Sequence, residues 1–221
     1  MNFKTLPDFL KTAPKNAKIT FLIRHAERRH ILPEDADNGA HVPITENGAQ
    51  AAFNAGSLFP QNGPANYVAS PVFRCRQTAA KIAQGRGDTK FDDPEFIIHE
   101  QKLAEFFVKD YDAYLKTLEE GFYEGICEYL KNGSHAAYKG LEEGSLEMLE
   151  LVKKYSTENL NFAVTHDAWI VPCLKYFCGI ECTPQKWLNF MSGIAFIFEG
   201  DSYRAEPVTF MDSGFLIFGG R

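Results

Sequence analysis

The chain lacks a net positive charge, and this absence excludes two classes of function. Its 221 residues include 23 lysines and arginines against 29 aspartates and glutamates, which gives a formal net charge of −6. A basic face that attracts phosphate groups is needed by proteins that bind nucleic acids without sequence preference and by proteins that lie on anionic membranes. We therefore expect no nucleic-acid partner and no membrane partner, and an anion site would have to be a local concentration of positive charge.

The chain also lacks the patterns of a disulfide scaffold, a membrane span and a secretory leader. Its five cysteines are odd in number and include no Cys-x-x-Cys pair, which predicts free thiols in a reducing compartment. No apolar run approaches the length of a membrane-spanning helix, and the first residues lack the basic and apolar regions of a signal peptide. These absences predict a cytoplasmic protein.

The spacing of histidines that metal-binding helices use is missing as well. Four of the six histidines have no His-x-x-x-His partner, and we expect them on the surface. These four are His30, His41, His99 and His135. We therefore expect no metal site.

What the chain does contain is apolar sequence in short, regularly separated stretches. It is 45% hydrophobic, and its length suits one domain. Residues 19–23, 67–69, 162–165 and 194–198 have strand character, with helical segments between the first of them. Alternating strands and helices predict an α/β fold with a largely parallel sheet.

The remaining segments complete this prediction. Helices are expected to begin after Thr45 and near Arg74. Residues 203–210 are expected to form a hairpin with the strand at residues 194–198. Residues from about 103 to 155 carry helical periodicity broken by glycines, which predicts an inserted helical block. This block is either a cap that shapes a cleft and excludes water or a set of ordinary packing helices.

Three of the expected strands end in polar residues that carry chemistry. The first leads into Arg24 and His25, with Arg28 close behind; the second leads through Ser70 to Arg74; the third leads into His166 and Asp167. The carboxyl ends of parallel strands meet at one edge of a sheet, so we expect these side chains to converge. Such a cluster is too positive to remain unoccupied, and a phosphoryl group, whose charge guanidinium groups stabilise and which a neutral imidazole can attack, suits it.

The motifs around these residues resemble the histidine phosphatase superfamily. Residues 24–26, Arg-His-Ala, match its Arg-His-Gly signature with alanine in place of glycine, and residues 70–79, Ser-Pro-Val-Phe-Arg-Cys-Arg-Gln-Thr-Ala, match its second arginine motif. Residues 43–48 resemble its Leu-Thr-x-x-Gly helix start, and residues 164–166 resemble the strand that brings in its second histidine. Together these matches span most of the chain in family order.

The resemblance implies a fold and a set of roles. The fold is a three-layer α/β/α sandwich in one domain over residues 1–221, with the helical block inserted. His25 would be the phosphorylated nucleophile, Arg24, Arg74 and His166 would bind the phosphoryl oxygens, and no metal or other cofactor is implied. Arg28 and the His166-Asp167 pair resemble the acid phosphatase branch, from which the chain departs at His30, where that branch has proline; its short length resembles the phosphoglycerate mutase branch.

The proton donor to the leaving group stays open between two carboxyl groups. We favour Asp167, because it follows a site histidine at the start of an expected helix; its alternative role is to stabilise that helix terminus. Glu105 is the rival, because Leu103-Ala104-Glu105 matches the Leu-x-Glu pattern of the mutase branch. Its alternative role is that of a solvated surface carboxylate.

These expectations lead to one function and two alternatives. We expect a phosphatase that hydrolyses a small phosphomonoester through a phosphohistidine on His25. The nearest alternative is a phosphoglycerate mutase-type phosphotransferase, in which a second hydroxyl replaces water as acceptor. The alternative from another class is a non-catalytic phospholigand-binding module. The identity of the substrate and the oligomeric state stay open at this point.

Overall fold

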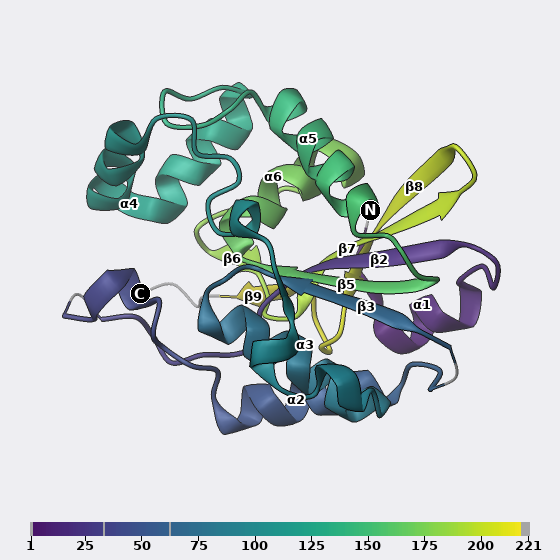
Figure 1. The fold of residues 1–221 in the computed structure, drawn as a ribbon. Coiled ribbons are helices and arrows are strands. Elements are labelled where there is room, and N and C mark those ends of the chain that lie inside the picture. Colours follow the sequence, from purple (N-terminus) through teal and green to yellow (C-terminus); the bar gives the residue numbers. More distant parts are fainter. Residues whose placement is uncertain (1, 33, 62, 218–221) are drawn as a thin grey trace.

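The computed structural model describes residues 2–32, 34–61 and 63–217, and it is organised around a seven-stranded sheet with helices on both faces (Figure 1). The strand order is β1-β8-β7-β2-β5-β3-β4. The strands are β1 (Lys4–Thr5), β2 (Lys18–Arg24), β3 (Ala65–Ala69), β4 (Ile98–His99), β5 (Leu160–Thr165), β7 (Ser192–Glu199) and β8 (Ser202–Thr209). A separate two-stranded sheet pairs β6 (Lys186–Leu188) with β9 (Phe215–Ile217).

The helices form two layers, and the predicted α/β/α sandwich is confirmed. They are α1 (Leu6–Thr12), α2 (Glu46–Ser57), α3 (Phe73–Arg86), α4 (Tyr111–Asn132), α5 (Leu141–Lys154) and α6 (Asp167–Cys178), with four short 3₁₀ helices between them. Helices α1, α2 and α3 cover one face of the sheet, and α4, α5 and α6 cover the other (Figure 1). The strand β2 shows why, because its alternating side chains enter two cores: Phe21 and Ile23 pack toward the first layer, and Leu22 packs toward the second.

The centre of the sheet is parallel, as the alternation of strands and helices predicts. Strand β5 pairs in parallel with β2 on one side and with β3 on the other, and β3 pairs in parallel with β4. Strands β7 and β8 form the predicted hairpin, and β7 is antiparallel to β2. The register sets Arg24 opposite Thr165 and Ala69 opposite Val164, so the strands β2, β3 and β5 end at the same edge.

Two helices that follow this edge begin where the sequence predicts. Thr45 caps α2 by accepting a hydrogen bond from the backbone N–H of Gly48, and α3 begins at Phe73, one residue before Arg74. The helices α2 and α3 lie against each other with almost no space between them, because a Cβ at Gly56 or Gly85 would collide with the backbone of the other helix. This close contact fixes α3, and with it the position of Arg74.

The predicted helical block contains α4 and α5. Helix α4 is kinked at Gly121, whose φ of 134° lies in a region that favours glycine. Five elements were not predicted: α1 and four strands of only two or three residues each, β1, β4, β6 and β9. No helix of the described residues is long and apolar enough to cross a bilayer.

Candidate active site

His25 directly follows β2 and is held with one ring nitrogen facing an arginine. Its backbone N–H continues the sheet by donating to the carbonyl of Thr165 at 3.0 Å, and the side chain is 2% exposed. Its Nδ1 donates to the carbonyl of Ala26 at 2.8 Å, so Nε2 carries the lone pair and accepts from Nε of Arg74 at 3.1 Å. Burial, followed by the positive charges of Arg24 and Arg74, lowers the pKa of His25 well below its usual value. The imidazole is therefore neutral and nucleophilic at Nε2.

Arg24 is fixed on three sides beside this histidine. It is 3% exposed, its Nη1 donates to the carbonyl of Leu188 at 2.5 Å, and its Nη2 pairs with Oδ2 of Asp167 at 2.9 Å. The guanidinium carbon lies 4.1 Å from the centre of the Phe190 ring. Its Nε is buried and finds no hydrogen-bond partner among the described residues, which is costly for a charged donor unless a ligand supplies an acceptor.

Arg74 and His166 lie next to His25 and next to each other. Arg74 is 7% exposed in the first turn of α3, and its Nη1 donates to the carbonyl of Gly39 at 2.8 Å. Its Nη2 faces Nδ1 of His166 at 3.5 Å, and Nε2 of His166 lies 3.1 Å from Oγ of Ser70. Burial, and then the charge of Arg74, lowers the pKa of His166, so this ring is neutral as well. The two imidazole centres are 5.6 Å apart.

Asp167 is the first residue of α6 and is a carboxylate in this structure. Its Oδ1 accepts from the backbone N–H of Ala168 at 3.1 Å, and its Oδ2 accepts from Nε1 of Trp187 at 2.8 Å as well as from Arg24. Burial raises the pKa of Asp167, but the charge of Arg24 and the hydrogen bond from Trp187 outweigh it and hold the pKa below its usual value.

Arg28 contributes a third guanidinium group to the cluster. Its Nη1 donates to the backbone carbonyl of the neighbouring Arg29. Within the described part of the chain, its Nε is buried without a hydrogen-bond partner and no carboxylate forms an ion pair with it. Burial, followed by repulsion from Arg74 and Arg24, lowers its pKa to about 10. The arginine is still charged at neutral pH, and its charge is poorly compensated.

The cluster as a whole carries an excess of positive charge. Three guanidinium groups, of Arg24, Arg28 and Arg74, are balanced by the single carboxylate of Asp167, and both imidazoles are neutral. The excess of two positive charges matches the charge of a phosphomonoester dianion.

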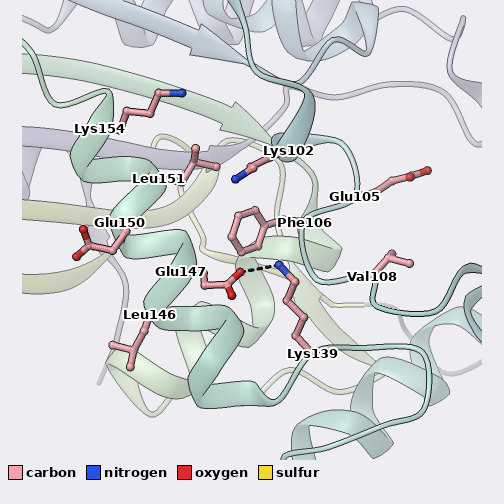
Figure 2. Close-up of a pocket in the computed structure, with 10 residues that line it drawn as sticks. All are labelled: Lys102, Glu105, Phe106, Val108, Lys139, Leu146, Glu147, Glu150, Leu151 and Lys154. Carbon is pink, nitrogen blue, oxygen red and sulfur yellow. Dashed lines mark hydrogen bonds and ion pairs between the residues drawn. The ribbon is translucent and has the colours of Figure 1, made fainter.

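Glu105 shares an electrostatic neighbour, Tyr114, with Asp167, and its segment borders the site, because the carbonyls of Leu103 and Ala104 accept hydrogen bonds from Thr165 and Trp169. Glu105 is exposed and lines a groove of about 900 Å³ between α5 and residues 102–108, and Figure 2 shows its carboxylate directed away from Lys102 and Lys139. Among the described residues, it forms no hydrogen bond or ion pair with the cluster around His25. The structure therefore joins six of the seven candidate residues and leaves Glu105 outside their contacts.

Three aromatic residues at the site were not predicted to belong to it, and the sequence favoured a core position for one of them, Tyr123. Trp187 and Phe190 come from the segment that contains β6, and Tyr123 comes from α4, where its electrostatic neighbours are Asp167, Arg24 and Arg28. They stand in no recognisable motif, and only the suggestion that the helical block caps a cleft pointed toward one of them. We propose that the helical block acts as a cap, because Tyr123 of α4 lies beside the charged residues of the site.

The remaining expectations concern histidines, cysteines and Ala26. Of the histidines expected on the surface, His30, His41 and His99 are exposed, whereas His135 is half-buried, because its Nδ1 accepts from the backbone N–H of Ala137 at 3.1 Å and its ring lies against Tyr138. The five cysteines carry free thiols. Ala26 is buried and donates its N–H to Oγ1 of Thr78 at 2.9 Å; it is not among the described non-glycine residues with positive φ, so alanine fits here. No group of three or more His, Cys, Asp or Glu residues in the described part of the chain could hold a metal ion.

Comparison with known proteins identifies the family. A family model of the histidine phosphatase superfamily (branch 1) matches residues 20–193, and the chain therefore belongs to this superfamily. No curated protein is significantly similar in sequence. The matching model is that of branch 1, although Arg28 and the His166-Asp167 pair resemble the acid phosphatase branch.

Solved structures share the fold at low sequence identity. Phosphoglycerate mutase from Bacillus anthracis has a TM-score of 0.54 and 16% identity, over 87% of this chain and 93% of that one. A mutant phosphoserine phosphatase from Entamoeba histolytica in complex with phosphoserine has a TM-score of 0.53 and 18% identity, over 85% and 94%. A mycobacterial glucosyl-3-phosphoglycerate phosphatase has a TM-score of 0.51 and 12% identity, over 86% and 96%.

Proposed function

We propose that the protein is a phosphoric monoester hydrolase that acts on a small phosphorylated metabolite through a phosphohistidine at His25. The observation that carries this proposal is the orientation of one ring: Nδ1 of His25 is tied to the Ala26 carbonyl, so the lone pair of Nε2 faces the guanidinium of Arg74. A phosphoryl group seated among the arginines would take the Nε–H of Arg74 onto one of its oxygens, which frees this lone pair to attack phosphorus. The family membership and the phosphatases among the structural neighbours support the same class of reaction.

The reaction proceeds in two displacements. In the first, Nε2 of His25 attacks phosphorus in line, the bond from phosphorus to the leaving oxygen breaks, and Arg24, Arg28, Arg74 and His166 stabilise the charge on the phosphoryl oxygens. In the second, water attacks the phosphohistidine, the N–P bond breaks, and phosphate leaves. Splitting one difficult transfer into two uses the same preorganised charges twice.

Asp167 is the proposed acid of the first step and the base of the second. It is a carboxylate in the free site, but a bound dianion competes for the guanidinium of Arg24 and adds negative charge beside it. Both effects raise the pKa of the carboxyl, so the proton needed by the leaving oxygen is taken up together with the substrate. Glu105, which is exposed and outside the cluster, is the alternative donor.

The test is turnover of generic phosphomonoesters by the wild type and by His25→Ala. We expect steady release of inorganic phosphate by the wild type and a loss of at least about 1000-fold in kcat for the variant, because the nucleophile is removed. Undiminished turnover by His25→Ala would refute the proposal.

A mutase activity is the second candidate, because phosphoglycerate mutase is among the structural neighbours. The two activities share the phosphohistidine and differ in the acceptor. Incubation with 2- and 3-phosphoglycerate separates them, since a mutase interconverts the isomers and a hydrolase releases only phosphate. A non-catalytic binding module would bind phosphate tightly and form no phosphoenzyme.

A further inference from the structure

Trp187 is a buried residue of β6 whose one side-chain hydrogen-bond donor binds the carboxylate of Asp167. Its side chain is 0% exposed, and its Nε1 lies 2.8 Å from Oδ2 of Asp167. An indole N–H can only donate, and a carboxylate is the strongest acceptor available to it in a protein interior. The hydrogen bond therefore stabilises the ionised form of Asp167 relative to its protonated form.

The neighbouring residue of β6 holds the other member of the ion pair. The carbonyl of Leu188 accepts from Nη1 of Arg24 at 2.5 Å, while Nη2 of the same guanidinium pairs with Asp167 at 2.9 Å. Two consecutive residues of one short strand thus fix an arginine and a carboxylate in a single arrangement. This strand pairs with β9, outside the main sheet.

Helix α4 covers the other side of the indole. The ring of Tyr123 lies 4.8 Å from the Trp187 ring at an interplanar angle of 81°, and the ring of Phe122 lies 6.0 Å from it. Both aromatic residues directly follow the kink at Gly121. Edge-to-face contacts of this kind hold a ring in one orientation, so α4 fixes the direction of the indole N–H.

We propose that Trp187 is a positioning residue that holds Asp167 as a carboxylate against Arg24 and thereby sets the pH range over which Asp167 serves as proton donor. This inference rests on the proposed role of Asp167 in the phosphatase reaction. The other titratable and charged groups that face Asp167 from the elements around it are Arg24, Arg28, Arg74, His166, Cys75, Tyr114, Tyr123 and Cys182. All of them are present in both variants compared below, so a difference between the variants reports the indole N–H.

The experiment compares Trp187→Phe with Trp169→Phe. Trp169 is the other tryptophan of the chain; it is 2% exposed, and its Nε1 donates to the carbonyl of Ala104 at 2.6 Å. Each variant loses one buried N–H···O bond, but only the first loses a bond to Asp167. The readout is the pH dependence of the phosphorylation step, measured in single turnovers of an alkyl phosphomonoester, whose leaving oxygen needs a proton.

Loss of the Trp187 hydrogen bond raises the pKa of Asp167, so its protonated form persists to higher pH. We expect the basic limb of the profile to move up by about one pH unit in Trp187→Phe and to stay in place in Trp169→Phe. A uniform loss of rate with an unmoved limb, or an equal movement in both variants, would overturn the inference. If Trp187→Phe does not fold, benzothienylalanine at position 187 replaces only the N–H by sulfur and serves the same comparison.

A second readout does not depend on turnover. The carboxyl carbon of Asp167 is titrated by NMR in protein labelled with ¹³C-aspartate and is assigned by its absence in Asp167→Asn. The resonance is expected to titrate at higher pH in Trp187→Phe than in the wild type, and an unchanged midpoint would contradict the positioning role. A raised midpoint in a protein that hydrolyses no phosphomonoester would refute the proposed function and leave the positioning role standing.

Discussion

The Nε–H of Arg74 lies 3.1 Å from Nε2 of His25, and the two residues come from different elements of the fold. Arg74 stands in the first turn of α3, whereas His25 follows β2. The same guanidinium reaches the Gly39 carbonyl at 2.8 Å and His166 at 3.5 Å, so one side chain ties the nucleophile to two other parts of the site. Several measurable consequences follow from this arrangement and from the charges around it.

We expect catalysis to require the planar shape of the Arg74 guanidinium as well as its charge. Lysine keeps the charge but cannot place donors on His25, Gly39 and His166 together, because it lacks the planar fork of donors. We expect Arg74→Lys to lower kcat/KM by about 100-fold or more while the melting temperature changes little. Steady-state kinetics with a generic phosphomonoester, together with thermal unfolding, checks this, and near-wild-type kinetics would show that charge alone suffices.

Arg28 is expected to bind the anion through its uncompensated charge. Arg28→Gln should weaken the binding of inorganic phosphate by about 10- to 100-fold, because a charge-assisted hydrogen bond to a poorly solvated anion is lost. Arg29→Gln is the matched control, since Arg29 is exposed and paired with Asp35. Calorimetric titration with phosphate distinguishes the two, and equal affinities in both variants would remove Arg28 from the site.

Stability is expected to fall as the pH is lowered through the normal titration range of histidine. The folded-state pKa of His25 lies well below 6.5, so the stability linked to its neutral form is fully present above pH 6.5 and is lost as the pH falls. Each such buried histidine lowers the unfolding free energy by about 1.4 kcal/mol between pH 7.5 and 5.5. Urea unfolding at the two pH values should show this loss in the wild type and a smaller one in His25→Gln, with exposed His30→Gln as the control. A wild-type stability that is independent of pH in this window would contradict a neutral His25.

The identity of the acid is expected to appear as a dependence on the leaving group. An alkyl leaving group needs a proton and a nitrophenyl group does not, so loss of the donor slows alkyl esters by about 100- to 10,000-fold and spares nitrophenyl phosphate. We expect this selective loss in Asp167→Asn, and we expect Glu105→Gln to behave like the wild type. The reverse result would make Glu105 the donor and would require the segment of residues 102–108 to lie differently when substrate is bound.

The site residues that follow the main apolar strands can be predicted from the sequence. Those that come from the short strand β6 and from the middle of α4 cannot. Arg24, His25, His166 and Asp167 stand at or just after the ends of apolar strands, Arg74 lies in the helix that follows β3, and the pairing of β5 with both β2 and β3 makes those strand ends adjacent. The convergence of these residues is therefore a consequence of parallel topology, which the alternation of strands and helices already indicates.

Trp187 could not be predicted in the same way. Strand β6 has three residues, which is too short for a periodic pattern, and its partner β9 lies about thirty residues further along the chain. Tyr123 follows the break at Gly121, which the sequence does indicate, but the break does not tell which side chains of α4 meet the site. Glu105 stays a prediction that rests on a three-residue motif, and its side chain is exposed in the segment of residues 102–108.

The most direct test of the central claim is to trap the phosphoenzyme. The wild type is mixed with a phosphomonoester labelled with ³²P, quenched in base within milliseconds, and digested for mass spectrometry. The account predicts one phosphate on Nε2 of His25, stable in base and lost in acid, and none in His25→Ala. Turnover with no phosphorylated histidine, or with the phosphate on a different residue, would contradict it.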